Sequence, residues 1–310
     1  MKKFAYEFVL LGLIGAVLAS AAILDPLFLS QNVQLELSSE IWELGLLTLG
    51  MTLIIITAGI DLSVGSAMGL CSVSLGLCMH ANLPAWLCGL VCLLTGLSAG
   101  AINGTLVAFI KVHPLLVTLA TYGMYRGFAE GLQSATTNAP VDASDGIKSI
   151  VTGGFPVIPV LFTALAVWTA ILLGRTAAGR GLYAIGHNEE AARFSGIPVA
   201  RLKFLIYTYT GLLAALAAIC YSARRSATAE AGMVLELDVI SAVVVGGTSI
   251  YGGRGRLIGT LLGVLLIHET RQFVDWYWQR SELTLIVIGT LLILAVLGHR
   301  FLFSRNPQTQ

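Results

Sequence analysis

Residues 186–198 read Gly-His-Asn-Glu-Glu-Ala-Ala-Arg-Phe-Ser-Gly-Ile-Pro and lie between two long apolar segments. This stretch has the start and stop signals of a short helix. Asn188 can cap the first turn, and Glu189 and Glu190 follow it where the helix dipole favours negative charge. Gly196 suits the position after the last helical residue, and the proline two residues later stops any continuation. A helix of about two turns is not stable alone in water, so it needs a surface on which to dock.

The composition indicates a membrane protein. The chain has 310 residues, of which 56% are hydrophobic and only 11% are charged. A soluble domain carries about 25% charged residues, so little of this chain is expected to lie outside a bilayer. The net charge is +1, and Lys and Arg do not cluster with aromatic residues. The composition therefore does not favour a nucleic-acid partner.

Apolar runs of about 20 residues can cross a bilayer, and the chain has about ten of them. The predicted segments are 8–24, 41–60, a run ending near 79, 84–110, 114–132, 156–174, 204–222, a pair within 239–268, and 283–297. The expected fold class is therefore an all-α polytopic membrane helix bundle. Small residues at 19–21 look like a signal-peptidase site, so cleavage of the first run is the alternative. The short loop that follows favours a retained first helix.

The pair within 239–268 is predicted to be irregular. Its region contains many glycines, at positions 246, 247, 252, 253, 255, 259 and 263. Irregular backbone at membrane depth persists only where protein or water satisfies it, so we expect two short or re-entrant segments. The residues from Arg271 to Trp278 then suggest an external interfacial turn. No Lys-Ser or Lys-Thr follows these glycines as a P-loop requires, so ATP must bind to another chain.

Positive side chains predict which loops face the cytoplasm. Residues 175–203 hold five of the 18 Lys and Arg residues and are expected to be cytoplasmic, as are both termini. The loop 25–40 has acidic residues and no Lys or Arg, which places it outside. The polar stretch 134–155 is the longest external loop and the natural place for an outside partner to dock.

Residues 58–66 read Ala-Gly-Ile-Asp-Leu-Ser-Val-Gly-Ser and place an acid between two apolar runs. An acid at this depth costs about 2.5 to 3.5 kcal/mol unless it faces water or a partner. The stretch closely resembles the corresponding segment of ABC importer permeases of the ribose, xylose, rhamnose and autoinducer-2 branch. Further stretches resemble the same branch: 111–121, 125–127, 236–249, 252–255 and 258–260.

Glu190-Ala191-Ala192, with Gly196 four residues later, resembles the EAA signature of the same importers. The resemblance implies one permease domain over 1–310, whose cytoplasmic loop 175–203 forms a coupling helix in a cleft of the ATPase subunit. The residues expected to couple are Asn188, Glu189, Glu190, Ala191, Ala192, Ser195 and Gly196. The resemblance also implies a second permease copy or paralogue, ABC ATPase subunits that bind the ATP, and an outside sugar-binding protein. No cofactor is expected on this chain.

Polar residues within the apolar segments are candidates for the translocation path or its gate. They are Asp61, Ser63, Asn103, Thr121, Asp238 and Thr248. For Asn103 an interhelical hydrogen bond is the favoured interpretation. Since no nucleophile, base and orienting group occur as a set, no catalytic residue is predicted.

Few charged residues occur in the candidate segments, which suits a neutral, hydroxylated solute. Ribose-type pentoses, deoxyhexoses and furanosyl signalling molecules all remain open, as do homodimer and heterodimer. An ion-coupled secondary sugar transporter is the alternative, and it needs an ionisable relay. Asp61, Glu43 and Glu130 are the obvious acids for such a relay, and none is clearly central. A passive channel would need no docking helix.

Overall fold

The computed structural model describes residues 5–136 and 157–303, and every regular element in these ranges is a helix. The α-helices are α1 (Ala5–Leu24), α2 (Gln31–Leu37), α3 (Ile41–Ile56), α4 (Val64–His80), α5 (Ala85–Ala108), α6 (Pro114–Thr136), α8 (Val157–Arg175), α9 (Ala177–His187), α10 (Glu189–Phe194), α11 (Val199–Arg224), α12 (Leu235–Val245), α13 (Leu257–Trp278) and α14 (Ser281–Phe303). Two 3₁₀ helices, η2 (Pro26–Leu29) and η3 (Ser38–Glu40), flank α2. Residues 1–4 and nearly all of the predicted external loop 134–155 lie outside the described residues.

Six of the described helical stretches are long and apolar enough to cross a membrane. They are Tyr6–Leu24, Gln31–Ile56, Ala85–Ala108, Val157–Arg175, Val199–Arg224 and Leu257–Trp278. The predicted all-helical fold is therefore confirmed for the described residues, and the six stretches are consistent with a polytopic membrane bundle. The count of about ten crossings stays a prediction, because α4 is shorter and α12, at 11 residues, is only about 16 Å long.

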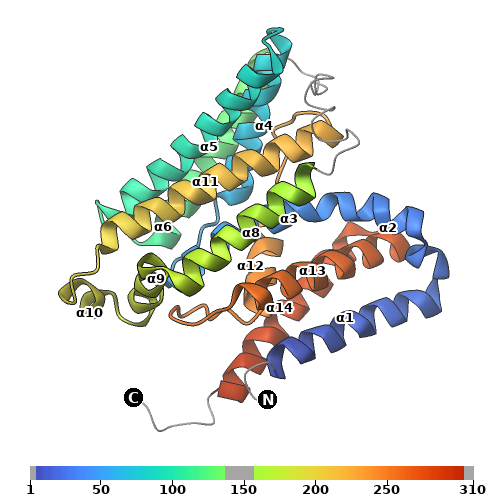
Figure 1. The fold of residues 1–310 in the computed structure, drawn as a ribbon. Coiled ribbons are helices and arrows are strands. Elements are labelled where there is room, and N and C mark those ends of the chain that lie inside the picture. The colour runs from blue at the N-terminus through green and yellow to red at the C-terminus, as the bar shows by residue number, and fades with distance from the viewer. Residues whose placement is uncertain (1–4, 137–156, 304–310) are drawn as a thin grey trace.

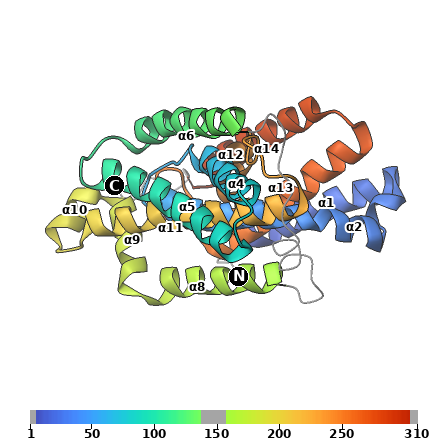
Figure 2. The same ribbon diagram turned by 90° about the horizontal axis from the view of Figure 1, so that it is seen from above.

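Helices α4, α5, α6 and α11 form one group of the bundle, and α1, α13 and α14 form another, with α3 between them (Figure 1). Seen from above, α6 and α8 lie along opposite edges (Figure 2). The close packing of α5 on α11 depends on glycines. A Cβ added at Gly96 would lie 2.3 Å from the carbonyl oxygen of Gly211, and one at Gly100 would lie 2.3 Å from that of Tyr207. Small residues thus let the two backbones approach.

The prediction of two short segments within 239–268 is wrong for its second half. α12 is short, but Leu257–Trp278 is one helix of 22 residues. Gly259 and Gly263 do not break it, because they face α12: a Cβ at Gly259 would lie 2.1 Å from the Gly246 oxygen, and one at Gly263 2.0 Å from the Ala242 oxygen. These two glycines allow close helix packing.

Two predicted loops are also helical. The stretch 25–40 contains η2, α2 and η3, so that the chain enters α3 from a helix. Arg271 and Asp275, expected in an external turn, lie in the last turns of α13, which ends only at Trp278. The N–H groups and carbonyls of both stretches therefore find partners within helices.

Candidate coupling helix and polar cavity

Helix α10 has the boundaries that its sequence predicts. The Asn188 side chain accepts a hydrogen bond from the Ala191 N–H over 2.9 Å and so caps the first turn. At the other end, the Ser195 hydroxyl donates to the Ala191 carbonyl over 2.9 Å. Gly196 has a φ of +80°, the left-handed conformation in which glycine commonly ends a helix.

One face of α10 is fixed to its neighbours. Ala192 is buried with Ile185 of α9 and Val199 of α11. Glu189 forms ion pairs with Lys203 of α11 and with Arg193 one turn along α10. A helix too short to be stable alone is thus held by an apolar contact and by charge pairs.

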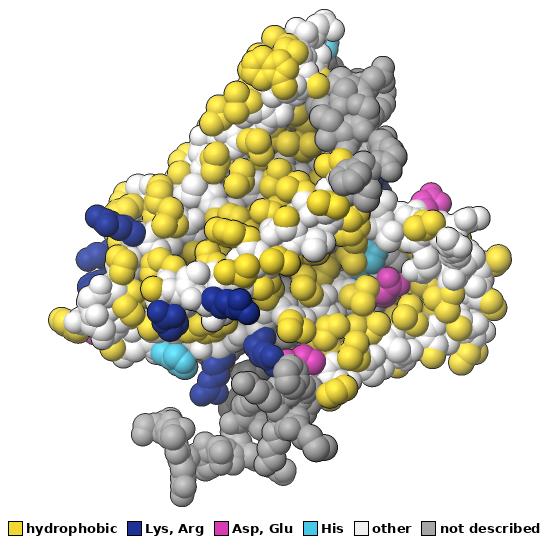
Figure 3. All heavy atoms as spheres, viewed as in Figure 1, with side chains coloured by type: hydrophobic (Ala, Val, Ile, Leu, Met, Phe, Trp, Pro, Cys, Tyr) yellow, Lys and Arg dark blue, Asp and Glu magenta, His cyan; other side chains and the backbone are white. Residues whose placement is uncertain are grey.

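The opposite face of α10 points to solvent. Phe194 is 90% exposed, and Glu190, four residues earlier on the same face, is also exposed. Lys and Arg side chains gather at this end of the molecule, around α9 and α10 (Figure 3). Phe194 therefore presents a large apolar side chain among charged residues.

Three backbones meet directly beside α10, and we call this contact the glycine junction: Ile56, Gly186 and Gly253. The Gly253 N–H donates to the Ile56 carbonyl over 2.9 Å. A Cβ at Gly186 would lie 1.9 Å from that carbonyl oxygen and 2.3 Å from the Gly253 nitrogen. The ends of α3 and α9 therefore contact the loop 246–256 without any side chain between them.

The loop 246–256 is also held by side chains. Tyr183 of α9 donates to the Gly255 carbonyl over 2.9 Å, and Tyr6 of α1 donates over 2.7 Å to the carbonyl of Val245, the residue directly before the loop. Burial raises the pKa of Tyr183, so its hydroxyl stays protonated and able to donate. The loop is therefore fixed to α9, next to the candidate coupling helix, and to α1.

Four of the six residues predicted for the path lie close together near the α10 end of the bundle. Asp61 is buried and accepts hydrogen bonds from the Ser63 N–H (2.8 Å) and the Ser63 hydroxyl (2.6 Å). Asn103 of α5 donates to the Ser63 oxygen over 2.7 Å, which is the interhelical bond that its position predicts. Tyr125 of α6 donates to Asn103 over 3.3 Å, and Thr121 lies one turn before it. The cavity beside Asp61 measures only about 10 Å³, which holds at most about one water.

The other two predicted path residues lie elsewhere. Asp238 of α12 pairs with Arg271 of α13. Thr248 lies in the loop 246–256, where a Cβ at Gly255 would lie 2.7 Å from its hydroxyl oxygen. The six residues therefore belong to three separate places and do not line one continuous cavity.

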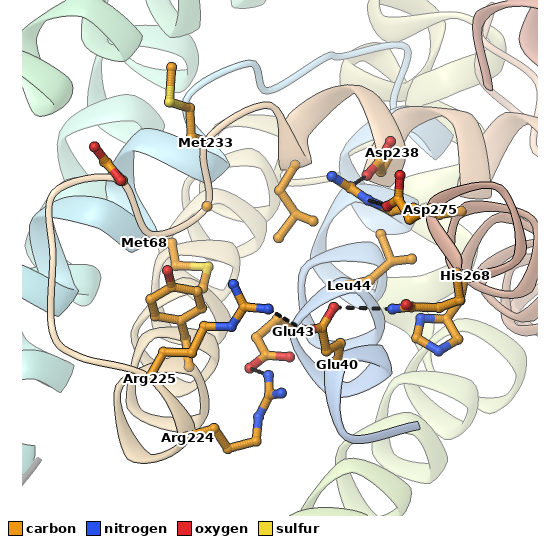
Figure 4. Close-up of a pocket in the computed structure, with 16 residues that line it drawn as sticks. Glu40, Glu43, Leu44, Met68, Arg224, Arg225, Met233, Asp238, His268 and Asp275 are labelled. Atoms are coloured by element: carbon orange, nitrogen blue, oxygen red, sulfur yellow. Dashed lines mark hydrogen bonds and ion pairs between the residues drawn. The ribbon is translucent and has the colours of Figure 1, made fainter. Parts of the chain in front are cut away.

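A larger polar cavity, of about 360 Å³, lies at the far end of α11 from α10 (Figure 4). The polar cavity and α10 are separated by the length of α11, about 39 Å for its 26 residues. The walls of the cavity come from η3, α3, α4, α11, α12, α13 and the loop before α12. Four ion pairs lie among its lining residues: Glu40 with Arg225, Glu43 with Arg224, and Arg271 with both Asp238 and Asp275.

Sequence reasoning found only Asp238 of this cavity as a site residue. Arg224 and Arg225 follow a long apolar run, and Glu40 and Glu43 lie at the start of another, which is a visible signal. Their pairing joins residues about 180 positions apart and depends on the packing of α3 against α11.

A family model described as the branched-chain amino acid transport system permease component matches residues 35–296. The chain belongs to this family. The autoinducer 2 import system permease protein LsrD of Photorhabdus laumondii subsp. laumondii is 33% identical over 305 residues, 96% of the chain and 92% of that relative. The LsrD protein of Escherichia coli O157:H7 is 34% identical over 314 residues, 98% of the chain and 94% of that relative.

A solved structure of a metal-chelate type ABC transporter in an inward-facing conformation has a TM-score of 0.56 to this permease. The two chains are 18% identical, and the similar region covers 94% of this chain and 99% of the other. At this low identity the similarity shows a shared fold only. The family match and the LsrD relatives confirm the resemblance to ABC importer permeases, so the chain is a membrane transport component. Membership of this permease family implies ATPase and substrate-binding partners in general.

Proposed function

We propose that this permease moves a monosaccharide-sized sugar across the bacterial cytoplasmic membrane, with ATP bound and hydrolysed on a separate ABC ATPase chain. Its relatives are autoinducer 2 import permeases, so autoinducer 2 is the first substrate to test. Pentoses such as ribose and deoxyhexoses such as rhamnose come next. The chain itself holds no cofactor under this proposal.

The exposed face of α10 supports the proposal most directly. Phe194 is 90% exposed, while the opposite face of the same short helix is fixed by Ala192 and Glu189. A large apolar side chain presented on a rigid base suits insertion into a cleft of a partner. We infer that this partner is the ATPase, and that Asn188, Glu190, Ala191, Ser195 and Gly196 shape the contact.

A displacement of α10 has a direct route into the bundle. α9 ends at the glycine junction, where its backbone contacts the end of α3 and the loop after α12. Because nothing compressible lies between these backbones, movement of α9 must move them as well. Alternating access would follow when ATP closes the ATPase dimer and α10 carries that motion inward.

The assembly that we propose contains two permeases, identical or paralogous, and two ATPases at the α10 end. A sugar-binding protein would dock at the opposite end. The chain would cross the membrane about ten times, with both termini in the cytoplasm, since the Lys- and Arg-rich α10 end suits that side.

Sugar uptake in vesicles tests this function. The vesicles would contain the permease with its candidate ATPase and binding protein, and both uptake and vanadate-sensitive ATP hydrolysis would be measured. Phe194→Asp is expected to lose most uptake and to release the ATPase, while Phe194→Leu, which keeps an apolar side chain, retains both. Equal membrane levels of the two variants control for folding.

Uptake that continues with Phe194→Asp would contradict the docking role of α10. Uptake that needs no ATPase and follows an ion gradient would contradict the importer function itself. That result would indicate that the permease functions as an ion-coupled secondary transporter.

A further inference from the structure

Residues 226–234, which we call the strap, connect α11 to α12 without forming a helix. The strap packs directly on the backbone of α4. A Cβ at Gly65 would lie 2.3 Å from the carbonyl oxygen of Gly232, and a Cβ at Gly69 would lie 2.7 Å from that of Ala229. Gly65 precedes Gly69 by one turn, so the strap runs along one face of α4 in the opposite direction.

The strap also borders the polar cavity. Glu230, Gly232 and Met233 line it, and Figure 4 shows Met233 on the same side of the cavity as Met68 of α4. α12 has 11 residues and is too short to cross a bilayer alone, so in the proposed topology the strap carries the chain through part of the membrane. Non-helical backbone at this depth needs protein or water beside it, and the strap has α4 on one side and the cavity on another.

Side chains of α4 and α6 hold the strap by its backbone. Arg126 of α6 donates to the Ala229 carbonyl, and the Ala229 N–H donates to Gln133 of α6 over 2.5 Å. The Thr228 N–H donates to the Ser72 hydroxyl of α4 over 3.1 Å. Release of the strap exposes little apolar surface, because its buried apolar side chains are three alanines, at positions 227, 229 and 231.

Val234 joins the strap to α12 in a strained conformation. Its φ is +65°, in the left-handed region that β-branched residues rarely adopt. Strain of this kind persists only where the surrounding contacts impose it, and it is common at switch regions. Here the contacts of the strap with α4 and α6 impose it, so release of the strap relaxes Val234.

Two buried polar atoms beside the strap have no hydrogen-bond partner among the residues that the structure describes: Arg126 Nη2 and Glu236 Oε2. A Cβ at Gly65 would lie 2.4 Å from Glu236 Oε2, and a Cβ at Gly69 would lie 2.9 Å from Arg126 Nη1. Since Cβ atoms one turn apart are about 6 Å from each other, the carboxylate and the guanidinium lie within about 11 Å. Both atoms are inaccessible, so a group of the chain itself is the natural partner for each.

Resting on the proposed transport function, we propose that the strap is the outer gate of the permease. In the closed state seen here, the strap lies on α4 and Arg126 binds the Ala229 carbonyl. In the open state, the strap leaves α4, Arg126 exchanges this carbonyl for the Glu236 carboxylate, and the polar cavity widens. The new ion pair and the relaxation of Val234 stabilise the open state, while the contacts with α4 stabilise the closed state.

Cysteine labelling tests the movement in the permease with its candidate ATPase and binding protein in lipid nanodiscs. Ala231 is fully buried under the strap, whereas Met233 is 61% exposed. In the resting complex, a maleimide should therefore react slowly with Ala231→Cys and rapidly with Met233→Cys. Addition of ATP and autoinducer 2 should speed the reaction of Ala231→Cys severalfold and change that of Met233→Cys little. Ala227→Cys, also buried, is the second reporter if Ala231→Cys does not assemble.

Glu236→Gln tests the exchange of partners. It removes the charge that attracts Arg126 in the open state, so uptake in vesicles and the acceleration of Ala231→Cys labelling should both fall severalfold. The thermal midpoint should stay the same or rise, because the carboxylate is buried and unpaired in the closed state. Glu36→Gln is the control, since Glu36 is an exposed acid on α2, and it should change neither uptake nor labelling.

Val234→Asn tests the strain, because asparagine tolerates the left-handed conformation better than valine. It should stabilise the closed state, raise the thermal midpoint and lower uptake severalfold. Gln279→Asn is the matched control: Gln279 has a φ of +51° but lies between α13 and α14, away from the strap. It should leave uptake unchanged.

Slow labelling of both buried reporters throughout ATP-driven uptake would overturn the gate, because the strap would then stay on α4 while sugar passes. Unmodified uptake by Glu236→Gln would overturn the exchange of partners. Either result would leave the transport function intact. A complex that shows no ATP-driven uptake at all would instead count against the proposed function.

Discussion

Gly186 has no room for a side chain, because a Cβ there would lie 1.9 Å from a backbone oxygen that cannot move independently. Gly186→Ala is therefore expected to destabilise the permease by about 1–3 kcal/mol through overpacking. This exceeds the ~1 kcal/mol that alanine gains over glycine within a helix. Thermal unfolding of the purified protein, followed by tryptophan fluorescence, should show a lower midpoint.

Gly174→Ala is the control at this scale. Gly174 lies in α8, and a Cβ there would meet nothing within 4 Å. Its midpoint should stay the same or rise slightly. If both alanine variants unfold at the same temperature, the glycine junction is not as tightly packed as described.

Single residues also show where sequence reasoning stops. Asn188 and Gly196 could be assigned their capping roles because capping depends on neighbours within a few positions. The close packing at Gly186 could not be predicted, because the atoms that exclude a side chain there belong to Ile56 and Gly253, which are far away in the sequence. The sequence indicates Glu43 only as an acid for an ionisable relay, whereas in the structure it lines the polar cavity.

At the scale of the element, the stability of α10 depends on its cap. Asn188→Ala removes the side chain that accepts from the Ala191 N–H and is expected to cost the helix about 0.5–2 kcal/mol. Hydrogen exchange measured by mass spectrometry should speed up over residues 189–195. Uptake should fall as well, because a frayed helix transmits less of the ATPase motion.

Asn188→Asp keeps an acceptor at the same position and adds a charge that the helix dipole favours. It should therefore exchange like the unmodified protein. If Asn188→Ala also exchanges at the unmodified rate, the contacts of Ala192 and Glu189 alone hold α10 in place.

Helices α12 and α13 show the limit of prediction for elements. Glycine lowers helix propensity, so the glycines from 246 to 263 predict interruptions throughout this region. The structure divides them by position: those before Leu257 form the loop, and Gly259 and Gly263 lie on the face of α13 that packs on α12. Helix propensity does not distinguish glycines in the loop from glycines in α13, because the difference depends on the neighbour that each glycine contacts in the fold.

For the whole molecule, the distribution of charge predicts an orientation in the membrane. Ser195 lies at the α10 end and Ala81 lies between α4 and α5 at the opposite end, and both are exposed. In intact cells, an impermeant maleimide should label Ala81→Cys and spare Ser195→Cys; in inside-out vesicles the pattern should reverse. Of the five native cysteines, four are buried and Cys78 is partly buried, so background labelling is expected to be low.

Binding of the ATPase should then protect Ser195→Cys in the inside-out vesicles and leave Ala81→Cys unaffected. Labelling of Ser195→Cys from outside the cell would invert the proposed topology. It would also remove α10 from the side on which ATP is hydrolysed.

Composition and the apolar runs of about 20 residues together predict the membrane helix bundle, because a soluble domain typically carries about 25% charged residues and this chain carries 11%. The polar cavity could not be predicted in the same way. Its walls come from helices separated by up to about 230 residues, and its ion pairs become visible only when α3, α11, α12 and α13 are placed together.

The glycine junction has a consequence for how permeases of this family can exchange parts during evolution. Its three backbones come from positions 56, 186 and 253, and each leaves space only for the shape of the other two. A recombination event that replaced one of these segments with that of a diverged homologue would bring together surfaces that were never selected to fit. Functional chimaeras should therefore inherit all three segments from one parent, while the outward face of α10 follows whichever parent supplied the ATPase.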